Sequence, residues 1–282
     1  MNLRNRLRIA RSLVKYGGII YRKRDRFFIA FAYYEDKIRE LFRWLDESNE
    51  IHNFTYDLTD INKQYLASLL AEITGADFET AQGYMHELEH DSFLINHVLK
   101  HSEGLQNADR RVLFGRRIGW YALTRILKPT LIVETGVEKG LGACVLTAAL
   151  KRNAAEGFPG KYIGTDINPK AGSLFKEPYS DYGTIMYGDS ITSLKKIHEQ
   201  IDLFINDSDH SAEYEAAEYE TIKDRLSGHA VILGDNSHVT NRLCDFSVRN
   251  NRRFVFFQEQ PAKHWYPGAG IGISVKTGPS ST

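Results

Sequence analysis

Polar side chains stand directly after two largely apolar segments in the C-terminal half of the chain. Asp207 follows the run 201–206, and the pair Asp235 and Asn236 follows the run 230–234. If both runs are neighbouring parallel strands, their carboxyl ends meet at one edge of a sheet and bring these side chains together. Carboxylate and amide oxygens suit Mg²⁺ and leave coordination positions for water or substrate. The sequence therefore predicts a magnesium site formed by Asp207, Asp235 and Asn236.

A second set of residues has the spacing of a nucleoside-binding edge. Glu134 ends a strand-like run and is followed by Gly136 and Gly140. Glycines are needed where a strand turns tightly into a helix and a ligand approaches the backbone. Asp166 and Asp189 stand at the ends of the next two predicted strands, and a carboxylate there can accept the hydroxyls of a ribose. These five residues predict a cofactor pocket.

The glycine loop alone does not decide which cofactor binds. Residues 135–142 also fit the TGxxxGxG loop of short-chain dehydrogenases, and Tyr219 with Lys223 has their YxxxK spacing. The interval between the loop and Tyr219 is too short for that family, however. Glu134 and Glu138 would also stand beside a pyrophosphate, which needs N–H donors. A cationic sulfonium cofactor without phosphates tolerates these acids better, and an NAD(P)-dependent dehydrogenase stays as the alternative.

On these residues the sequence resembles the class I S-adenosylmethionine-dependent methyltransferases. Glu134, Gly136 and Gly140 match the acid-x-Gly-x-x-x-Gly loop of their first motif, and Asp166 matches their ribose-binding acid. The resemblance implies S-adenosylmethionine as the cofactor and methyl transfer as the reaction.

Asp207 and Asp235-Asn236 resemble the metal site of the catechol-type O-methyltransferases. In those enzymes an Asp after strand four and an Asp-Asn pair after strand five hold magnesium. His210 takes the place of their catalytic lysine, and this Asp-x-x-His spacing is similar to the macrocin and mycinamicin O-methyltransferases of antibiotic biosynthesis. Those sugar-modifying enzymes tend to carry two acids where this chain has Asp235 and Asn236.

The resemblance implies that a cation activates a hydroxyl of a sugar or glycosylated small molecule. A coordinated cation can lower the pKa of a bound oxygen by several units. His210, with an ordinary pKa of about 6.5, would then accept the remaining proton. His210 and Asp207 are therefore the expected catalytic residues. A metal-independent methyltransferase and a binding module without turnover stay open.

The elements that position these residues follow from the apolar pattern. After about residue 110, short apolar runs alternate with helical segments. This alternation predicts a doubly wound, Rossmann-like α/β fold with a mostly parallel sheet of seven strands. We expect a helical region over residues 1–110 and the methyltransferase domain over 111–282. The predicted strands are Leu131–Glu134, Tyr162–Asp166, Thr184–Tyr187, Ile201–Asn206, Ala230–Gly234, Phe254–Phe257 and Ile271–Val275, the last two forming an antiparallel hairpin.

Charge is balanced over the whole chain but not along it. The 282 residues hold 36 Lys and Arg against 36 Asp and Glu, which argues against nucleic-acid binding. Residues 1–26 contain one acid, Asp25, and a basic amphipathic helical pattern that Gly17 and Gly18 are expected to end. This segment is expected either to be a solvated helix on its own acidic body or to contact anionic lipid or an acidic partner. Its nine basic residues are Arg4, Arg6, Arg8, Arg11, Lys15, Arg22, Lys23, Arg24 and Arg26.

Other sequence features mainly limit the class of protein. No apolar run reaches the roughly 20 residues of a membrane-spanning helix, and Cys144 and Cys244 are too few for a disulfide framework. We therefore expect a cytoplasmic protein, and homo-oligomerisation stays open. Residues 86–90 spell HExxH, a zinc motif on a helix, but the continuation that would supply a third ligand is missing.

Overall fold

The computed structural model describes residues 3–49, 55–103, 109 and 111–276. Its contacts divide the chain into two units. The first is Met1–Ser48 with Lys263–Trp265, and the second is Asn49–Ala262 with Tyr266–Thr282.

The first unit consists mainly of two helices, α1 (Leu3–Arg22) and α2 (Arg24–Glu47), which meet at Lys23. The expected end of the first helix at Gly17 and Gly18 is wrong, since α1 continues through both glycines to Arg22. Glycine costs an α-helix only about 1 kcal/mol relative to alanine, so it weakens a helix without ending it.

The second unit begins with helices that the sequence caps explicitly. Its first four helices are α3 (Asp60–Thr74), α4 (Phe78–Glu89), α5 (Ser92–Ser102) and α6 (Arg117–Leu127). The side chains of Thr59, Asp77 and Asp91 accept hydrogen bonds from the first turns of α3, α4 and α5. Gly75 ends α3 in the left-handed conformation, with φ of 76°.

A seven-stranded sheet follows in the order β4-β3-β2-β5-β6-β9-β7, in which only β9 is antiparallel to its neighbours. The predicted Rossmann-like fold, its seven strands and the antiparallel final pair are confirmed. The strands are β2 (Leu131–Thr135), β3 (Lys161–Asp166), β4 (Gly183–Tyr187), β5 (Ile201–Asn206), β6 (Leu226–Gly234), β7 (Arg252–Phe257) and β9 (Ile271–Lys276).

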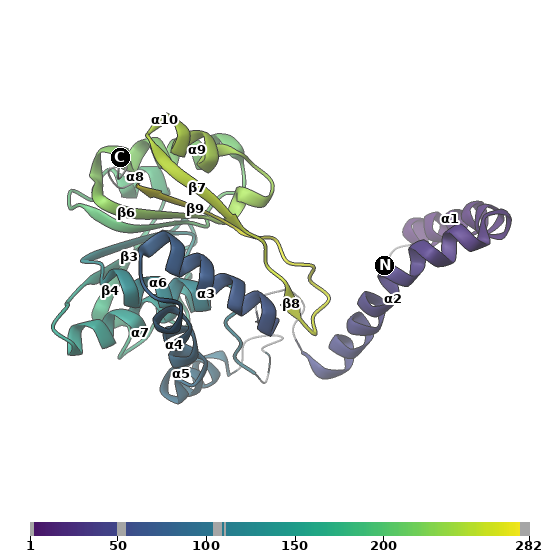
Figure 1. Cartoon of the computed structure of the whole chain (residues 1–282), viewed down its shortest axis with the longest axis horizontal. Coiled ribbons are helices and arrows are strands. Elements are labelled where there is room, and N and C mark those ends of the chain that lie inside the picture. Colours follow the sequence, from purple (N-terminus) through teal and green to yellow (C-terminus); the bar gives the residue numbers. More distant parts are fainter. Residues whose placement is uncertain (1–2, 50–54, 104–108, 110, 277–282) are drawn as a thin grey trace. The chain divides into compact units, whose positions relative to one another are not determined.

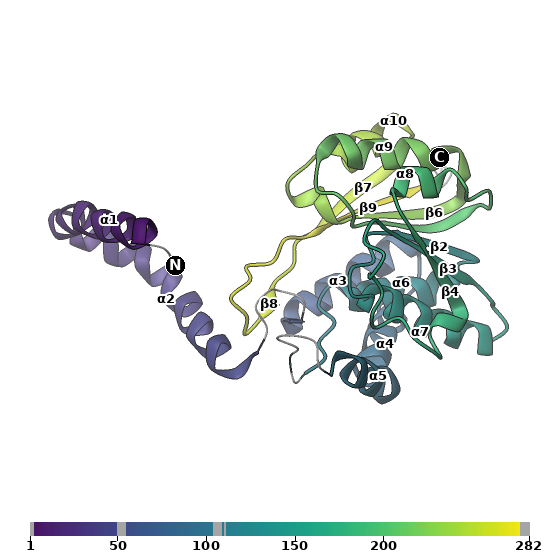
Figure 2. The ribbon, with the colours of Figure 1, turned by 180° about the vertical axis from the view of Figure 1, so that it is seen from behind.

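Helices cover both faces of this sheet (Figures 1 and 2). Helices α3 to α6 and α7 (Leu141–Ala155) lie on one face, and α8 (Ser190–Leu194), α9 (Ala212–Ile222) and α10 (Arg242–Arg249) lie on the other. Alternate strand residues serve the two cores: Ile132 and Leu203 face the first, whereas Val133 and Phe204 face the second. Short 3₁₀ turns complete the unit at Ser180–Tyr182, Lys223–Arg225 and Asp235–His238.

The sequence pattern missed a short ladder between distant parts of the chain. Strand β1 (Asp57–Leu58), in a region expected to be helical, pairs antiparallel with β8 (Pro261–Ala262), in a segment expected to be a loop. Two residues are too few to show an alternating pattern, and Pro261 argues locally against a strand.

Strand order reverses between β2 and β5, so the loops after these neighbouring strands open a crevice at the carboxyl edge. Along the described part of the chain, none of the helices combines the length and the apolar character needed to cross a bilayer.

Candidate functional site

A cavity of about 580 Å³ lies at this carboxyl edge. Five of the predicted site residues line it, from the loops after four strands: Gly136, Asp166, Asp189, Asp207 and His210. The other four, Glu134, Gly140, Asp235 and Asn236, are not among its lining residues.

Gly136 is required by the contact between the loops after β2 and β5. Its φ is 85°, and a Cβ at this position would lie 1.9 Å from the carbonyl oxygen of Asp207. Gly140 begins α7 with φ of 93° and packs against Gly172, whose Cα would lie 3.1 Å from an added Cβ. Both glycines are therefore fixed by the chain's own packing, in addition to any ligand.

Asp166 closes the glycine loop. One of its oxygens accepts a hydrogen bond from the backbone N–H of Glu138 at 2.8 Å, and the other accepts from Asn168 at 2.8 Å. Each carboxylate oxygen keeps a second lone pair with which it can accept a ligand hydroxyl.

Asp189 caps α8 and holds a negative charge at the cavity wall. It accepts hydrogen bonds from the backbone N–H of Thr192 at 2.7 Å and from the Tyr214 hydroxyl at 2.6 Å. These donors lower the pKa of Asp189, because they stabilise the charged form.

Beneath the cavity, the fully buried carboxylate of Glu218 on α9 joins several strand ends. One oxygen accepts from Thr135 at 2.9 Å and from Asn206, and the other accepts from Ser208 at 2.8 Å and from Ser190. Burial raises the pKa of Glu218, and the four donors oppose that shift. Sequence reasoning missed this residue, since an acidic helix such as α9 is ordinarily a solvated face.

Glu134 supports the glycine loop from below. It is 2% exposed and accepts a hydrogen bond from the Tyr162 hydroxyl. Its other oxygen lies against Gly142, where an added Cβ would come within 2.4 Å of it. Burial raises the pKa of Glu134 to about 7.

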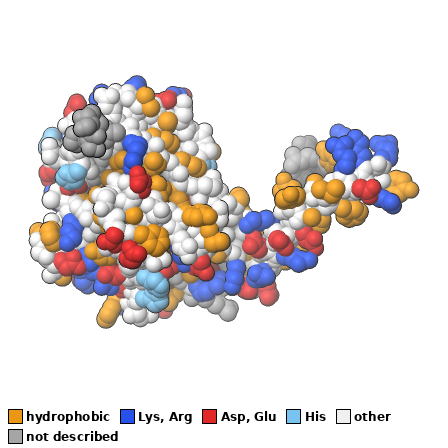
Figure 3. Space-filling model, viewed as in Figure 1, with side chains coloured by type: hydrophobic (Ala, Val, Ile, Leu, Met, Phe, Trp, Pro, Cys, Tyr) orange, Lys and Arg blue, Asp and Glu red, His pale blue; other side chains and the backbone are white. Residues whose placement is uncertain are grey.

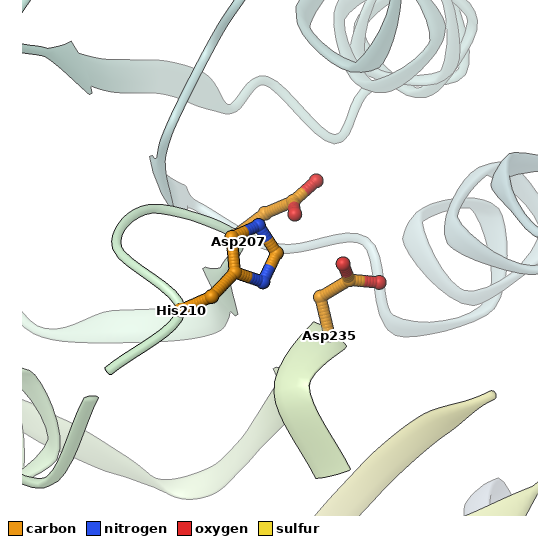
Figure 4. A group of neighbouring side chains, drawn as sticks. All are labelled: Asp207, His210 and Asp235. Carbon is orange, nitrogen blue, oxygen red and sulfur yellow. The ribbon is translucent and has the colours of Figure 1, made fainter. Parts of the chain in front are cut away.

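Three metal-type ligands converge beside the cavity (Figure 4). Ligand atoms of Asp207, His210 and Asp235 all lie within 4.8 Å of one another. Asn236, the other predicted ligand, lies beside this group: its Oδ1 contacts His210 Nδ1, and its Nδ2 donates to the carbonyl of Asp209 at 3.2 Å. When His210 Nδ1 donates to Asn236, Nε2 keeps the lone pair that a cation or a proton can take.

Arg116, just before α6, supplies positive charge at the same place. Its Nη2 lies 2.8 Å from Asp235 Oδ1 and 3.5 Å from Asp207 Oδ2, and its Nη1 lies 3.7 Å from Glu259 Oε1. Burial and the neighbouring Asp235 raise the pKa of Asp207, and Arg116 opposes them. No motif pointed to Arg116, because it belongs to none of the strand ends.

Asp207, His210 and Asp235 fit a divalent cation by their chemistry. Two carboxylates and an imidazole are donors that Mg²⁺ or Mn²⁺ accepts, although the imidazole also suits other transition metals. Oδ1 of Asp235 is buried and makes an ion pair with Arg116 but no hydrogen bond. Arg116 is thus the cationic partner of this oxygen in the structure, and a cation bound to Asp235 would compete with it.

Comparison with protein families assigns this region. Residues 133–237, which include the glycine loop and the carboxylates described above, match the family model described as "Methyltransferase domain". Residues 133–237 are therefore similar to a methyltransferase domain. A comparison with curated proteins found no significant match.

The second unit of the chain has the fold of solved methyltransferases, to which its sequence identity is low. A methyltransferase from Podospora anserina, PaMTH1, bound to S-adenosylhomocysteine, is 18% identical, with a TM-score of 0.50 over 70% of this chain and 93% of that one. A Klebsiella pneumoniae protein provisionally assigned as an O-methyltransferase is 14% identical, with a TM-score of 0.51 over 68% of this chain and 94% of that one.

The dehydrogenase alternative loses its catalytic tyrosine. Tyr219 is fully buried, packs against Phe246, and its hydroxyl donates a hydrogen bond to Glu215 at 2.8 Å. A hydride-transfer enzyme of that class needs this hydroxyl at the substrate.

The HExxH motif lies on α4 and just after it. His86 and His90 approach each other to 3.0 Å through their Nδ1 atoms, but Glu87 accepts from Tyr121 and from Arg125 at 2.9 Å. Within the described ranges, the only group of three or more metal-type ligands is Asp207, His210 and Asp235.

The Glu218 cluster gives a direct test of stability. We expect Glu218→Ala to lower the free energy of unfolding by about 3–5 kcal/mol, because it leaves buried donors without an acceptor. Urea denaturation followed by circular dichroism measures this change. Glu220→Ala, on the same helix but at the surface, should cost less than about 1 kcal/mol. Equal losses of unfolding free energy in both variants would show that the hydrogen bonds to Glu218 do not stabilise the fold more than a surface side chain does.

Glu134 should make stability depend on pH. Its pKa is about 7 in the folded protein and about 4.3 in an unfolded chain. The stability that the protonated carboxyl contributes is therefore fully present below about pH 4.3 and is lost as the pH rises from there through about 7. Glu134→Gln should therefore gain stability relative to the parent between pH 5 and pH 8, by up to about 3 kcal/mol. Denaturation curves at the two pH values measure this, with the exposed Glu213→Gln as control. Parallel pH profiles for parent and Glu134→Gln would contradict the assignment.

Proposed function

We propose that the protein is an S-adenosylmethionine-dependent O-methyltransferase that uses a divalent cation, Mg²⁺, to methylate a hydroxyl of a sugar or glycosylated small molecule. The convergence of Asp207, His210 and Asp235 beside a nucleoside-sized cavity carries the proposal. The Podospora and Klebsiella structures support its cofactor and reaction class. We place the reaction in the biosynthesis of a glycosylated natural product in the cytoplasm.

The charge of the cavity favours a sulfonium cofactor over a dinucleotide. Its lining, all of it within the described residues, contains five carboxylates and neither Lys nor Arg. Such a wall attracts the positive charge of S-adenosylmethionine and repels the pyrophosphate of NADP. The five acids are Glu138, Asp166, Asp189, Asp207 and Asp209.

The residues of the site divide the work of methyl transfer. Asp207 and Asp235, with His210 as the third ligand or as the base, would hold the cation, which supplies Lewis acidity to the acceptor oxygen. His210 takes the acceptor proton at Nε2 when it is not a ligand, and Asn236 fixes the orientation of its ring through Nδ1. The cavity places the methyl donor beside these groups, so positioning contributes much of the rate.

The same proposal covers the organisation of the chain. The chemistry belongs to residues 111–282, with a boundary near residue 110 in the sequence. Helices α3, α4 and α5, which precede that boundary, share its hydrophobic core, since Leu66, Leu88 and Leu94 belong to the same buried cluster as Trp120 and Leu141.

Ligand binding and His210 test the reaction class together. Calorimetry should show binding of S-adenosylmethionine and S-adenosylhomocysteine and none of NADP. His210→Ala should lower the methylation rate by roughly 10²–10⁴-fold and retain cofactor binding, because it removes the base or third ligand and leaves the carboxylates of the cavity in place. The exposed His198→Ala is the control. Binding of NADP without the sulfonium ligand would overturn the class, and loss of cofactor binding in His210→Ala would make His210 structural.

Arg116 and a bound cation should compete for Asp207 and Asp235. Arg116→Gln leaves these buried carboxylates without their counter-charge, so we expect it to unfold at a lower temperature and to be stabilised by Mn²⁺ more than the parent is. Melting curves with Mn²⁺ and with EDTA measure this. Arg253→Gln, which removes an exposed pair with Glu72, is the control.

Two results would count against the metal. If EDTA leaves turnover unchanged and Asp235→Ala retains activity, the cation has no part in the reaction. If Mn²⁺ shifts the melting temperature of the parent and of Arg116→Gln equally, Arg116 does not compete for the site.

A further inference from the structure

The junction of α1 and α2 combines exposed basic and exposed apolar residues. Four basic residues, Arg22, Lys23, Arg24 and Arg26, stand exposed at the junction. An uninterrupted apolar and aromatic segment, Phe27–Tyr34, follows directly. The space-filling view shows hydrophobic and basic side chains at the surface of these two helices (Figure 3).

The apolar segment has no core of its own in the structure. Helix α2 contains no buried residue, and Phe28, Ile29, Tyr33 and Tyr34 are 62%, 69%, 83% and 64% exposed. Eight consecutive residues cover more than two turns, so the apolar surface surrounds the helix instead of forming one stripe. A helix that is apolar on all sides is ordinarily buried in a protein core or in lipid.

We propose that this junction binds the surface of an anionic phospholipid bilayer. The basic residues would lie at the headgroups, and the segment Phe27–Tyr34 would enter the boundary with the acyl chains. The tyrosines suit that depth, because each has an apolar ring and a polar hydroxyl. Since none of the described helices can cross a bilayer, the contact is peripheral.

The charge of residues 1–26 favours an anionic membrane surface over a second copy of the chain as the binding partner. Residues 1–26 carry nine basic residues and one acid, so a symmetric pairing of two such segments would bring like charges together. An anionic surface neutralises the same charges. The proposal adds a place of action to the proposed function and does not depend on the acceptor.

Vesicle flotation of the full chain tests the proposal. The protein should float with vesicles of phosphatidylcholine containing about one third phosphatidylglycerol, and at least about tenfold less with phosphatidylcholine alone. Arg22→Gln with Arg26→Gln should weaken binding about tenfold or more, and so should Phe28→Ser with Ile29→Ser. Each variant is first checked for unchanged helix content and cofactor binding.

A matched control removes the same charge further along α2. Lys37→Gln with Arg39→Gln also loses two basic residues, but these already pair with Glu40 at 2.9 Å and Glu35 at 2.7 Å. Vesicle binding should stay within about twofold of the parent. Absence of binding to the anionic vesicles overturns the proposal. So does a dimer that the Phe28 and Ile29 changes dissociate while vesicle binding is unaffected.

Discussion

The buried carboxylate of Glu218 is the interaction on which the site depends. A carboxylate without water is tolerated only when donors surround it, and here four side chains do so: Thr135 and Asn206 at the ends of β2 and β5, Ser208 in the loop after β5, and Ser190 at the start of α8. These are the segments that also carry the cavity wall. The fold thus uses one costly burial to fix the arrangement of these segments.

Around this centre, the site concentrates negative charge and compensates for it locally. Burial and the nearby Asp235 disfavour ionisation of Asp207, and Arg116 offsets part of this effect. Arg116 also faces Glu259, which accepts a hydrogen bond from Tyr56. A single guanidinium, that of Arg116, thus faces three carboxylates at this place.

Sequence reasoning succeeded where the structure depends on local pattern. Apolar runs mark the ends of strands, which is why Asp166, Asp189 and Asp207 could be placed at one edge of the sheet from the sequence alone. Glu218 and Arg116 could not be found this way, since their partners lie as many as 83 and 143 residues away in the sequence, the latter separating Arg116 from Glu259. Asn236 was expected as a ligand, and its contact with His210 Nδ1 depends on rotamers, which spacing in the sequence does not give.

The close approach of Gly136 to Asp207 has a consequence for the order of events. The two loops touch with no room for a single methyl group, and the N–H of Asp207 also donates to the carbonyl of Thr135 at 2.9 Å. A displacement of the loop after β2 therefore displaces the first carboxylate of the cation group. If a cofactor binds in the cavity and a cation binds at Asp207, the two affinities are thermodynamically linked: each ligand changes the affinity for the other, by the same factor in either order.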